Sequence, residues 1–447
     1  MTVTNLSYHN ILDLLIYRKV TIAPLVTFRI LFGLLMLVST IRFWANGWID
    51  ELYIAPQFYF SFIEGVRPLT GLGMYWVFAS MIVAAIFITI GFAYRISAIS
   101  FFILFTYVEL LDKSNYLNHY YFVSLISFLM CWLPANGDFS LDVKFGFRKA
   151  IDQIPVAFIN ILRFQMGALY FFAGLAKMNP SWLFEGQPLK MWLSANAYKP
   201  LIGWIFQYKI TAYIFSWFGM IYDTTIPFLL SWSSTRLLAY ILVIGFHLMT
   251  WWLFPIGMFP FIMIVITTIF FSPESHLRVL EPLKQMVGWY STQEETTTIY
   301  QGQKWVFVAF IILQIALPFR YLAYPGDLFW TEQGYRFSWR VMLMEKAGYA
   351  TFYVSERGEK KRSVIANYEY LMPQQEKMMA TQPDMLVQFA HYLEADFKEK
   401  GMVDPVVTAD VFVTLNGQPN KRYIDPKVDL TEVQNDWGHK SWILSYE

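Results

Sequence analysis

Long apolar segments separated by short polar stretches occupy most of the first 322 residues of the chain. A segment of about 17 to 25 apolar residues is long enough to cross a hydrocarbon core of about 30 Å as a helix. We identify nine such segments, at residues 22–44, 74–94, 96–112, 117–135, 154–176, 211–232, 235–254, 257–272 and 304–321. The pattern predicts a polytopic α-helical membrane protein with about nine transmembrane helices.

Residues 181–209, between the fifth and sixth segments, are rich in tryptophan and lysine. This composition is typical of a segment that lies along the membrane interface rather than across the membrane. We expect the segment to cover a site at that face.

The chain becomes polar after residue 322, and its patterns change. "QPDMLVQFAHYLEADFKEKG" (residues 382–401) has apolar residues at helical spacing and ends in glycine, which predicts one amphipathic helix. "PVVTADVFVTLNGQPNKRYIDP" (residues 405–426) alternates around Asn416-Gly417, which predicts a β-hairpin. We therefore predict a helical transmembrane domain at residues 1–322 and a C-terminal, water-facing, β-rich α+β domain at residues 323–447.

Composition supports a membrane protein and excludes several other classes. Hydrophobic residues make up 56% of the chain and charged residues only 15%, far from the values of ordinary soluble enzymes. A net charge of +1 gives no support for an extended basic surface, so nucleic acid is not an expected partner. The single cysteine, Cys131, excludes an intrachain disulfide, and without a metal-ligand motif such as HExxH we predict no protein-bound metal.

The positive charges in the short loops predict the orientation of the chain. With the N-terminus in the cytoplasm, the inner side holds Arg18, Lys19, Arg95, Lys144, Arg148, Lys149, Arg236, Arg278 and Lys284, and the outer side holds Arg67, Lys113, Lys177, Lys190, Lys199 and Lys209. This bias of nine against six places the C-terminal domain outside.

Three polar features fall on that outer side, close to the ends of apolar segments. They are Asn118 and His119 in "NYLNHYYF", Lys177 at the end of "YFFAGLAK", and His247 in "GFHLMTWW". Polar groups at membrane depth usually line a cavity or face protein, which favours one shared site beneath the C-terminal domain. The alternative is that Lys177 extends to the interface and that each histidine satisfies a local backbone group.

Several long blocks, in the same order, resemble vitamin K-dependent gamma-glutamyl carboxylases. The blocks are "ELLDKSNYLNHYYFVSLISFLMCWLPANGDFSLD", "YFFAGLAKMNPSWL", "FHLMTWWLFPIGMFPFIMIVITTIFFSP", "GYRFSWRVMLMEKAG" and "RYIDPKVDL". The resemblance covers residues from about 20 to 440. It implies Lys177 as the weak base that starts the reaction, and His119, next to Asn118, as a group that stabilises developing negative charge.

In the fourth block the resemblance assigns Tyr335 and Trp339 to the glutamate and quinone region and Met342 to the neighbourhood of the quinone. The animal enzymes carry a histidine where this chain has Met344, and they have paired cysteines that are absent here. The first departure bears on cofactor or substrate handling. The second matters less, because a disulfide mainly stabilises a lumenal domain.

The implied reaction oxidises vitamin K hydroquinone with O2 to an epoxide and adds CO2 to a glutamate of a protein or peptide. The expected partners are that peptide, a lipophilic quinone and the lipid bilayer. An amine starts such chemistry only when it is uncharged, and an apolar surrounding disfavours the charged form. We expect His247 to line the same pocket, and we expect a multi-pass protein of the bacterial inner membrane.

Two other functions stay open at this point. One is a membrane enzyme that oxidises a quinol without carboxylating peptides, which the change at Met344 favours. The other is a non-catalytic membrane protein in which Lys177 and His119 bind a lipid, a solute or a partner.

Overall fold

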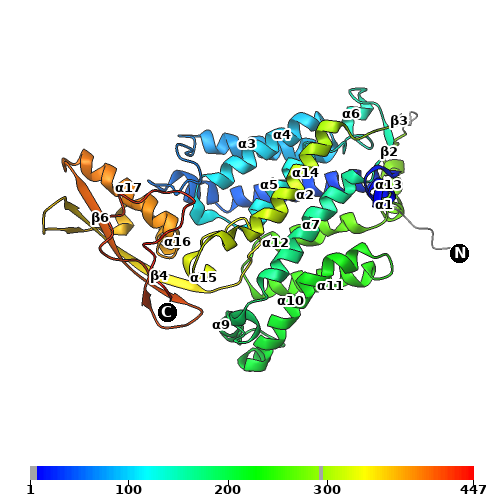
Figure 1. The fold of residues 1–447 in the computed structure, drawn as a ribbon. Helices are drawn as coiled ribbons and strands as arrows, with labels where there is room; N and C mark the ends of the chain where they lie inside the picture. The colour runs from blue at the N-terminus through cyan, green and yellow to red at the C-terminus, as the bar shows by residue number, and fades with distance from the viewer. Residues whose placement is uncertain (1–7, 291–294, 447) are drawn as a thin grey trace.

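The structure, a computed structural model, describes residues 8–290 and 295–446. Figure 1 shows long helices packed side by side, with a small sheet and its covering helices at one end of the molecule. The first described helix, α1 (Tyr8–Tyr17), lies at the opposite end of the molecule, as does α13 (Pro273–Met286).

Five helical runs in the described part of the chain are long and apolar enough to cross a membrane. They are α2 (Ala23–Ala45), α3 (Gly73–Ile90), α7 (Ala157–Ala176), α11 (Arg236–Leu253) and Gln301–Ala323, which joins α14 (Gln301–Ala316) to the 3-10 helix η5 (Leu317–Ala323). A sixth span is possible where α12 (Phe259–Ile266) and the 3-10 helix η4 (Thr267–Phe270) bend by 108° into α13.

The predicted count of nine membrane spans is not confirmed. The other predicted segments correspond to α4 (Tyr94–Leu110), α5 (Asn118–Met130) and α10 (Lys209–Ser231). Helix α5 has 13 residues, which is about 20 Å at 1.5 Å per residue and shorter than the hydrocarbon core. The predicted span 117–135 was too long, because the helix ends before the turn at "CWLPANG".

Short elements connect these helices. They are α6 (Leu141–Lys144), α8 (Pro180–Leu183), α9 (Leu189–Ala195), the π-helix η1 (Asp50–Ile54), and the 3-10 helices η2 (Lys113–Asn115) and η3 (Gly203–Gln207). A three-stranded sheet in the order β1-β2-β3 lies at the α1 end and consists of β1 (Lys19–Thr21), β2 (Ile151–Pro155) and β3 (Glu295–Thr296). The predicted interfacial segment folds into α8, α9 and η3.

The C-terminal region is built on a second, antiparallel sheet in the order β5-β4-β6-β7. Its strands are β4 (Lys346–Glu356), β5 (Ser363–Val364), β6 (Pro405–Leu415) and β7 (Lys421–Arg422). Its helices are α15 (Leu328–Thr331), η6 (Asn367–Glu369), α16 (Pro373–Met379) and α17 (Pro383–Glu399). Side chains of β6 alternate between buried and half-buried, as expected for a sheet with one face covered by helices.

Two sequence predictions for this region are confirmed. Helix α17 is the predicted amphipathic helix. Strands β6 and β7 form the predicted hairpin, in which Asn416 and Gly417 both have positive φ, at 51° and 76°. Asparagine and glycine are the residues that tolerate this conformation best, so the turn follows from local sequence.

The buried apolar residues form three clusters. The first lies among the long helices, the second lies between the C-terminal sheet and its helices, and a small third cluster lies beneath α9. The connector, residues 333–345, contacts all three: Trp339 belongs to the first, Leu343 to the third, and Met344 packs on the second. The position of this connector is therefore fixed from three sides.

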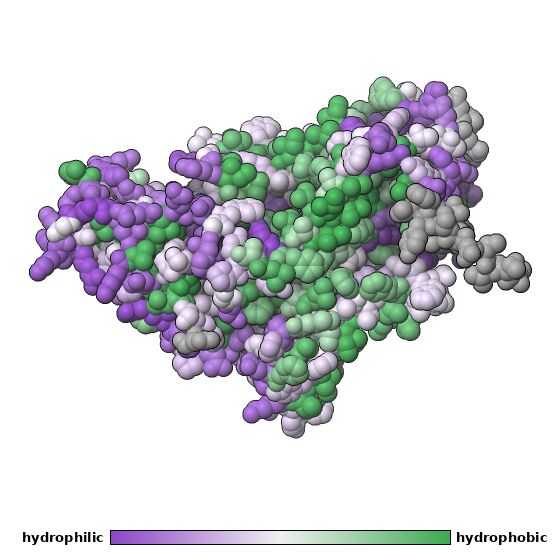
Figure 2. Space-filling model, viewed as in Figure 1, coloured by the Kyte–Doolittle hydropathy of each residue, from purple (hydrophilic) through white to green (hydrophobic). Residues whose placement is uncertain are grey.

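The surface follows the same division. Figure 2 shows hydrophilic residues gathered on the C-terminal region and at the opposite end, with hydrophobic residues over the helices between them. An apolar band between two polar ends is the surface expected of a protein that spans a bilayer.

Candidate active site

Lys177 is the residue immediately after α7, and it lies in the interior of the protein. Its residue exposure is 6%. Its Nζ donates hydrogen bonds to Asp223 Oδ2 at 2.7 Å and to the Ala173 carbonyl oxygen at 3.3 Å, and it lies 5.5 Å from the centre of the Trp182 ring. Lys177 is therefore not an anchor reaching to water but one half of a buried ion pair.

Asp223 comes from the middle of α10, which packs along α7. The two helices approach closely at Gly174, where an added Cβ would lie 2.6 Å from the Thr224 backbone nitrogen. Real Cβ atoms essentially never come so close, so only glycine permits this approach. Gly174 lies one turn before Lys177, and Thr224 follows Asp223, so the helix contact brings the amine and the carboxylate together.

The pair faces a cavity of about 100 Å³ whose lining is mainly apolar. Its walls come from α7, α10, α11, α12, the segment around α8 and α9, and the connector. The lining residues are Leu169, Tyr170, Ala173, Lys177, Trp182, Leu189, Trp192, Phe215, Phe218, Gly219, Asp223, Phe246, His247, Met249, Thr250, Leu253, Phe254, Ile256, Phe259, Met263, Val341 and Met342. The segment around α8 and α9 contributes Trp182, Leu189 and Trp192, so it does cover this site.

His247 is a further polar residue of the cavity lining. The residue is 2% exposed, and its Nε2 lies 2.8 Å from the Tyr170 hydroxyl. Its Nδ1 is buried and has no hydrogen-bond partner among the described residues. Since buried polar atoms are normally paired, a free ring nitrogen on a cavity wall is suited to a hydrogen bond with a bound molecule.

The structure brings together three of the seven candidate residues from the sequence, and four lie outside the cavity. Lys177, His247 and Met342 line it. The other four are Asn118, His119, Tyr335 and Trp339. The ring of Phe259 lies between the two histidines, with its centroid 5.8 Å from His119 and 5.8 Å from His247. His119 is therefore next to the cavity, behind a wall residue.

Asn118 and Trp339 hold the connector against α5. Asn118 Nδ2 donates to the Arg340 carbonyl oxygen at 3.1 Å, and its Oδ1 accepts from the Tyr116 hydroxyl at 3.3 Å. The fully buried Trp339 stacks on Tyr121 with ring centroids 5.0 Å apart. These contacts fix the segment that carries Met342 to the cavity.

Three non-glycine residues of the connector have left-handed backbone angles. They are Phe337 (φ 61°), Trp339 (φ 59°) and Met342 (φ 53°). Such conformations cost of order 1–3 kcal/mol each and persist only where the surroundings enforce them. Because strained backbone gathers at ligand sites, this segment has the character of a functional connector.

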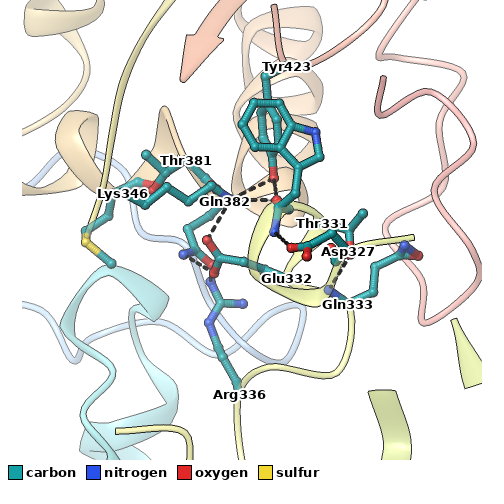
Figure 3. A network of polar contacts seen from close by, with 11 residues as sticks. Asp327, Thr331, Glu332, Gln333, Arg336, Lys346, Thr381, Gln382 and Tyr423 are labelled. Atoms are coloured by element: carbon teal, nitrogen blue, oxygen red, sulfur yellow. Dashed lines mark hydrogen bonds and ion pairs between the residues drawn. The ribbon is translucent and has the colours of Figure 1, made fainter. Parts of the chain in front are cut away.

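A polar network ties the two ends of the connector together (Figure 3). Lys346 Nζ donates to Glu332 Oε1 at 2.9 Å, to the Trp330 carbonyl oxygen at 2.7 Å and to the Tyr423 hydroxyl at 3.2 Å. Burial lowers the pKa of the Lys346 amine, against the opposing effect of the Glu332 carboxylate. The ion pair closes the loop that carries the half-buried Tyr335, and desolvation raises the pKa of its hydroxyl.

Asp223 is the site residue that sequence reasoning missed. Its signal was a carboxylate in the middle of the apolar segment 211–232, where an ionisable group is expensive and indicates a functional contact. No group of three or more His, Cys, Asp or Glu residues in the described ranges could hold a metal ion. The absence of a protein-bound metal stays a prediction.

The fold and this site define a multi-pass helical membrane protein with a buried lysine-aspartate pair in an apolar cavity and a C-terminal sheet-containing region. Two family models match the chain: the HTTM domain over residues 17–274, and the vitamin K-dependent gamma-carboxylase lumenal domain over residues 301–447. No solved structure matches it. The protein belongs to the vitamin K-dependent gamma-carboxylase family and is a carboxylase-like membrane protein. The family implies use of vitamin K hydroquinone, O2 and CO2, and a glutamate-containing protein substrate.

Proposed function

We propose that the protein couples oxygen-dependent epoxidation of vitamin K hydroquinone to the carboxylation of peptidyl glutamate. The observation that carries the proposal is the Lys177–Asp223 pair, at 2.7 Å, in a largely apolar cavity of a chain from this family. A base that must act on a lipophilic quinol needs such a site, because bulk water would hydrate the amine and compete for the proton.

The cavity fits the head group of a quinol in chemistry more readily than in size. Lys177 and the free Nδ1 of His247 are suited to bind hydroxyl groups, and the remaining walls are mainly apolar. A cavity of about 150 Å³ holds a single benzene ring, so the volume of about 100 Å³ requires the lining to move. Met249, Met263 and Met342 line it, and methionine repacks easily because it is unbranched and flexible.

When bound, the hydroquinone supplies the electrons that reduce oxygen, and its oxidation drives removal of the weakly acidic γ-proton of glutamate. Lys177 accepts the hydroxyl proton of the quinol at Nζ. Asp223 Oδ2 is within hydrogen-bond distance of that amine, so it can take a proton from the ammonium and return it. With the quinol proton added, the pair carries one positive charge, as ammonium and carboxylic acid, and the hydroquinolate formed beside it balances that charge in a site of low dielectric.

We assign the remaining candidate residues by position. His247 donates to or accepts from the quinol at Nδ1, and Met342 contacts its ring system. For His119 we propose stabilisation of developing negative charge, which requires Phe259 to move aside. Tyr335 and Trp339 orient the glutamyl side chain through the connector.

We propose that Asn118 keeps the connector in place beside His119, since the Asn118 side chain donates a hydrogen bond to the Arg340 carbonyl oxygen. Closure of the apolar walls would keep water from the carbanion that attacks CO2, since water would reprotonate it.

We propose that the helical domain covers residues 1–322 and the extramembrane domain residues 323–447. Their separate apolar clusters support this division. The excess of basic residues in the inner loops supports a C-terminal domain on the outer face of the membrane, which we propose to be a bacterial inner membrane. A quinol from the bilayer and a peptide from the aqueous side would then meet where the two domains join.

The test uses purified protein in lipid with reduced vitamin K, labelled bicarbonate and a short glutamate-rich peptide, and it measures epoxide and incorporated label together. Lys177→Ala should lose both products, and a small exogenous amine should restore part of each. Lys190→Ala is the matched control, because Lys190 lies in the same region, bonds to the Tyr213 hydroxyl and does not line the cavity. It should keep both products.

The other outcomes distinguish the alternatives. Epoxide without label in the peptide would identify a quinol-oxidising enzyme without carboxylase activity. Neither product, with the protein folded and the quinol bound, would identify a non-catalytic lipid-binding or solute-binding protein. Equal losses in Lys177→Ala and Lys190→Ala would remove Lys177 from the chemistry.

A further inference from the structure

A second, larger cavity lies on the other side of α7. It has a volume of about 1250 Å³ and is lined by α7, α10, α14 and the end of α1. Phe171 and Phe172 line this groove, whereas Tyr170 and Ala173 line the Lys177 cavity. In Figure 1, α7 lies between α14 and α10, and all three helices contribute lining residues to the groove. Nothing in the proposed reaction uses it.

Four basic residues line one end of the groove, and no carboxylate lines it within the described ranges. They are Arg18, Arg163, Arg236 and Lys304. Arg163 and Arg236 each donate to a backbone carbonyl oxygen at 2.9 Å, and Lys304 donates to the Tyr17 hydroxyl at 2.8 Å. Among the residues that the structure describes, none of the four forms an ion pair, so their neutral partners leave the positive charge uncompensated.

The cations also repel one another, since Arg18 and Arg236 both act electrostatically on Arg163. A cluster of like charges beside an apolar wall costs free energy. A bound anion would offset that cost, because opposite charges close together favour the charged forms.

The rest of the groove is an apolar channel. Along α14 it extends from Lys304 to Ile315, which is about 16 Å at 1.5 Å per residue. That length is about half of a 30 Å hydrocarbon core, the depth of one leaflet. Phe164, Phe171 and Ile311 line the walls.

We propose that this groove binds an anionic phospholipid. Its phosphate lies against Arg236, Lys304 and their basic neighbours, and its acyl chains lie between α7 and α14. A neutral quinone would not need four cations in its binding site, and a soluble anion would not need an apolar channel as deep as one leaflet. The site is independent of the proposed reaction, and the charged end lies on the side predicted to face the cytoplasm, where the leaflet is anionic.

The test adds dioleoyl phosphatidylglycerol or dioleoyl phosphatidylcholine to delipidated protein in detergent and counts bound lipids by native mass spectrometry. The variants are Lys304→Gln, Arg236→Gln and the double variant. Arg278→Gln is the control, since Arg278 is an exposed residue predicted to lie on the same side, and it does not line the groove. Size-exclusion chromatography selects the folded fraction of each protein before measurement.

We expect phosphatidylglycerol to bind more tightly than phosphatidylcholine and its affinity to fall about fivefold for each cation removed, the change that corresponds to about 1 kcal/mol per basic residue. Phosphatidylcholine binding should change little. Equal binding of the two lipids, an unchanged preference in the double variant, or an equal loss in Arg278→Gln would each overturn the proposal. If Arg236→Gln does not fold, Lys304→Gln alone decides, because its side chain bonds only to a tyrosine hydroxyl.

Discussion

The Lys177–Asp223 pair predicts a strongly non-additive effect on stability. Both side chains are 8% exposed and their charged atoms are 2.7 Å apart. Removing one partner leaves the other as a buried charge without its counter-ion, which costs about 3–5 kcal/mol. Replacing both by apolar residues of similar size removes both charges, and such replacements are often neutral or stabilising.

Lys177→Met and Asp223→Leu should therefore each lower the thermal midpoint, and the double variant should be more stable than either single variant. If the two effects simply added, the double variant would lose about 6–10 kcal/mol. The coupling free energy expected from this ion pair is thus at least about 3 kcal/mol. The prediction is tested by whether the double variant has a higher or a lower thermal midpoint than the single variants.

The assay is thermal unfolding in detergent, followed by the fluorescence of the 17 tryptophans of the chain. Lys149→Met and Glu295→Leu form the control cycle, because their ion pair is 69% and 50% exposed and surface pairs contribute little. Their effects should be small and additive. A double Lys177→Met/Asp223→Leu variant less stable than both single variants would refute the buried ion pair, whatever the enzyme does.

Two further predictions concern the approach of α7 to α10 and the C-terminal region. Gly174→Ala should lower the free energy of unfolding by about 1–3 kcal/mol, because the added methyl group overpacks against Thr224, and it should reduce both reaction products. Gly245→Ala in α11 is the control, because nothing lies within 4 Å of the added methyl group. It should be neutral or slightly stabilising in the same unfolding and turnover assays. Burial opposes ionisation of Asp384, but Arg336 and Lys113 hold the pKa of its carboxyl well below the usual range. The contribution of the Asp384 carboxylate to stability is therefore present above the unfolded pKa of about 3.9 and is lost as the pH falls through the lower folded pKa. The difference in thermal midpoint between wild type and Asp384→Asn should narrow below about pH 4. A constant difference from pH 7 to pH 3 would contradict this.

The features that sequence predicted well are those set by local signals. Asn416-Gly417 specifies a turn by its own backbone preferences, and the helical spacing of apolar residues in 383–399 specifies α17. Lys177 and His247 could be placed near one another because both lie toward the same ends of their apolar segments. The length of α5 was overestimated, because hydropathy continues past the point where the backbone turns.

The features that sequence did not predict depend on packing between distant elements. Asp223 becomes the partner of Lys177 only because Gly174 lets α10 approach α7. Hydropathy alone does not identify this pair, because a single carboxylate hardly changes the average of a long apolar segment. The backbone conformation of the connector is harder still to predict from sequence. Phenylalanine, tryptophan and methionine locally disfavour positive φ, so their left-handed conformations at Phe337, Trp339 and Met342 arise from the three clusters around them.

The ion pair also changes the physical explanation of the lysine. Considered alone, a lysine in an apolar segment is expected to lose its charge because of desolvation. Asp223 changes this picture, since its carboxylate oxygen lies 2.7 Å from Lys177 Nζ and can share a proton with the amine. The proton can move within the pair, because ammonium with carboxylate and amine with carboxylic acid have the same net charge. An arginine at residue 177 would not allow this exchange, since a guanidinium keeps its proton, so the reaction that we propose requires both a lysine and a carboxylate that can accept its proton.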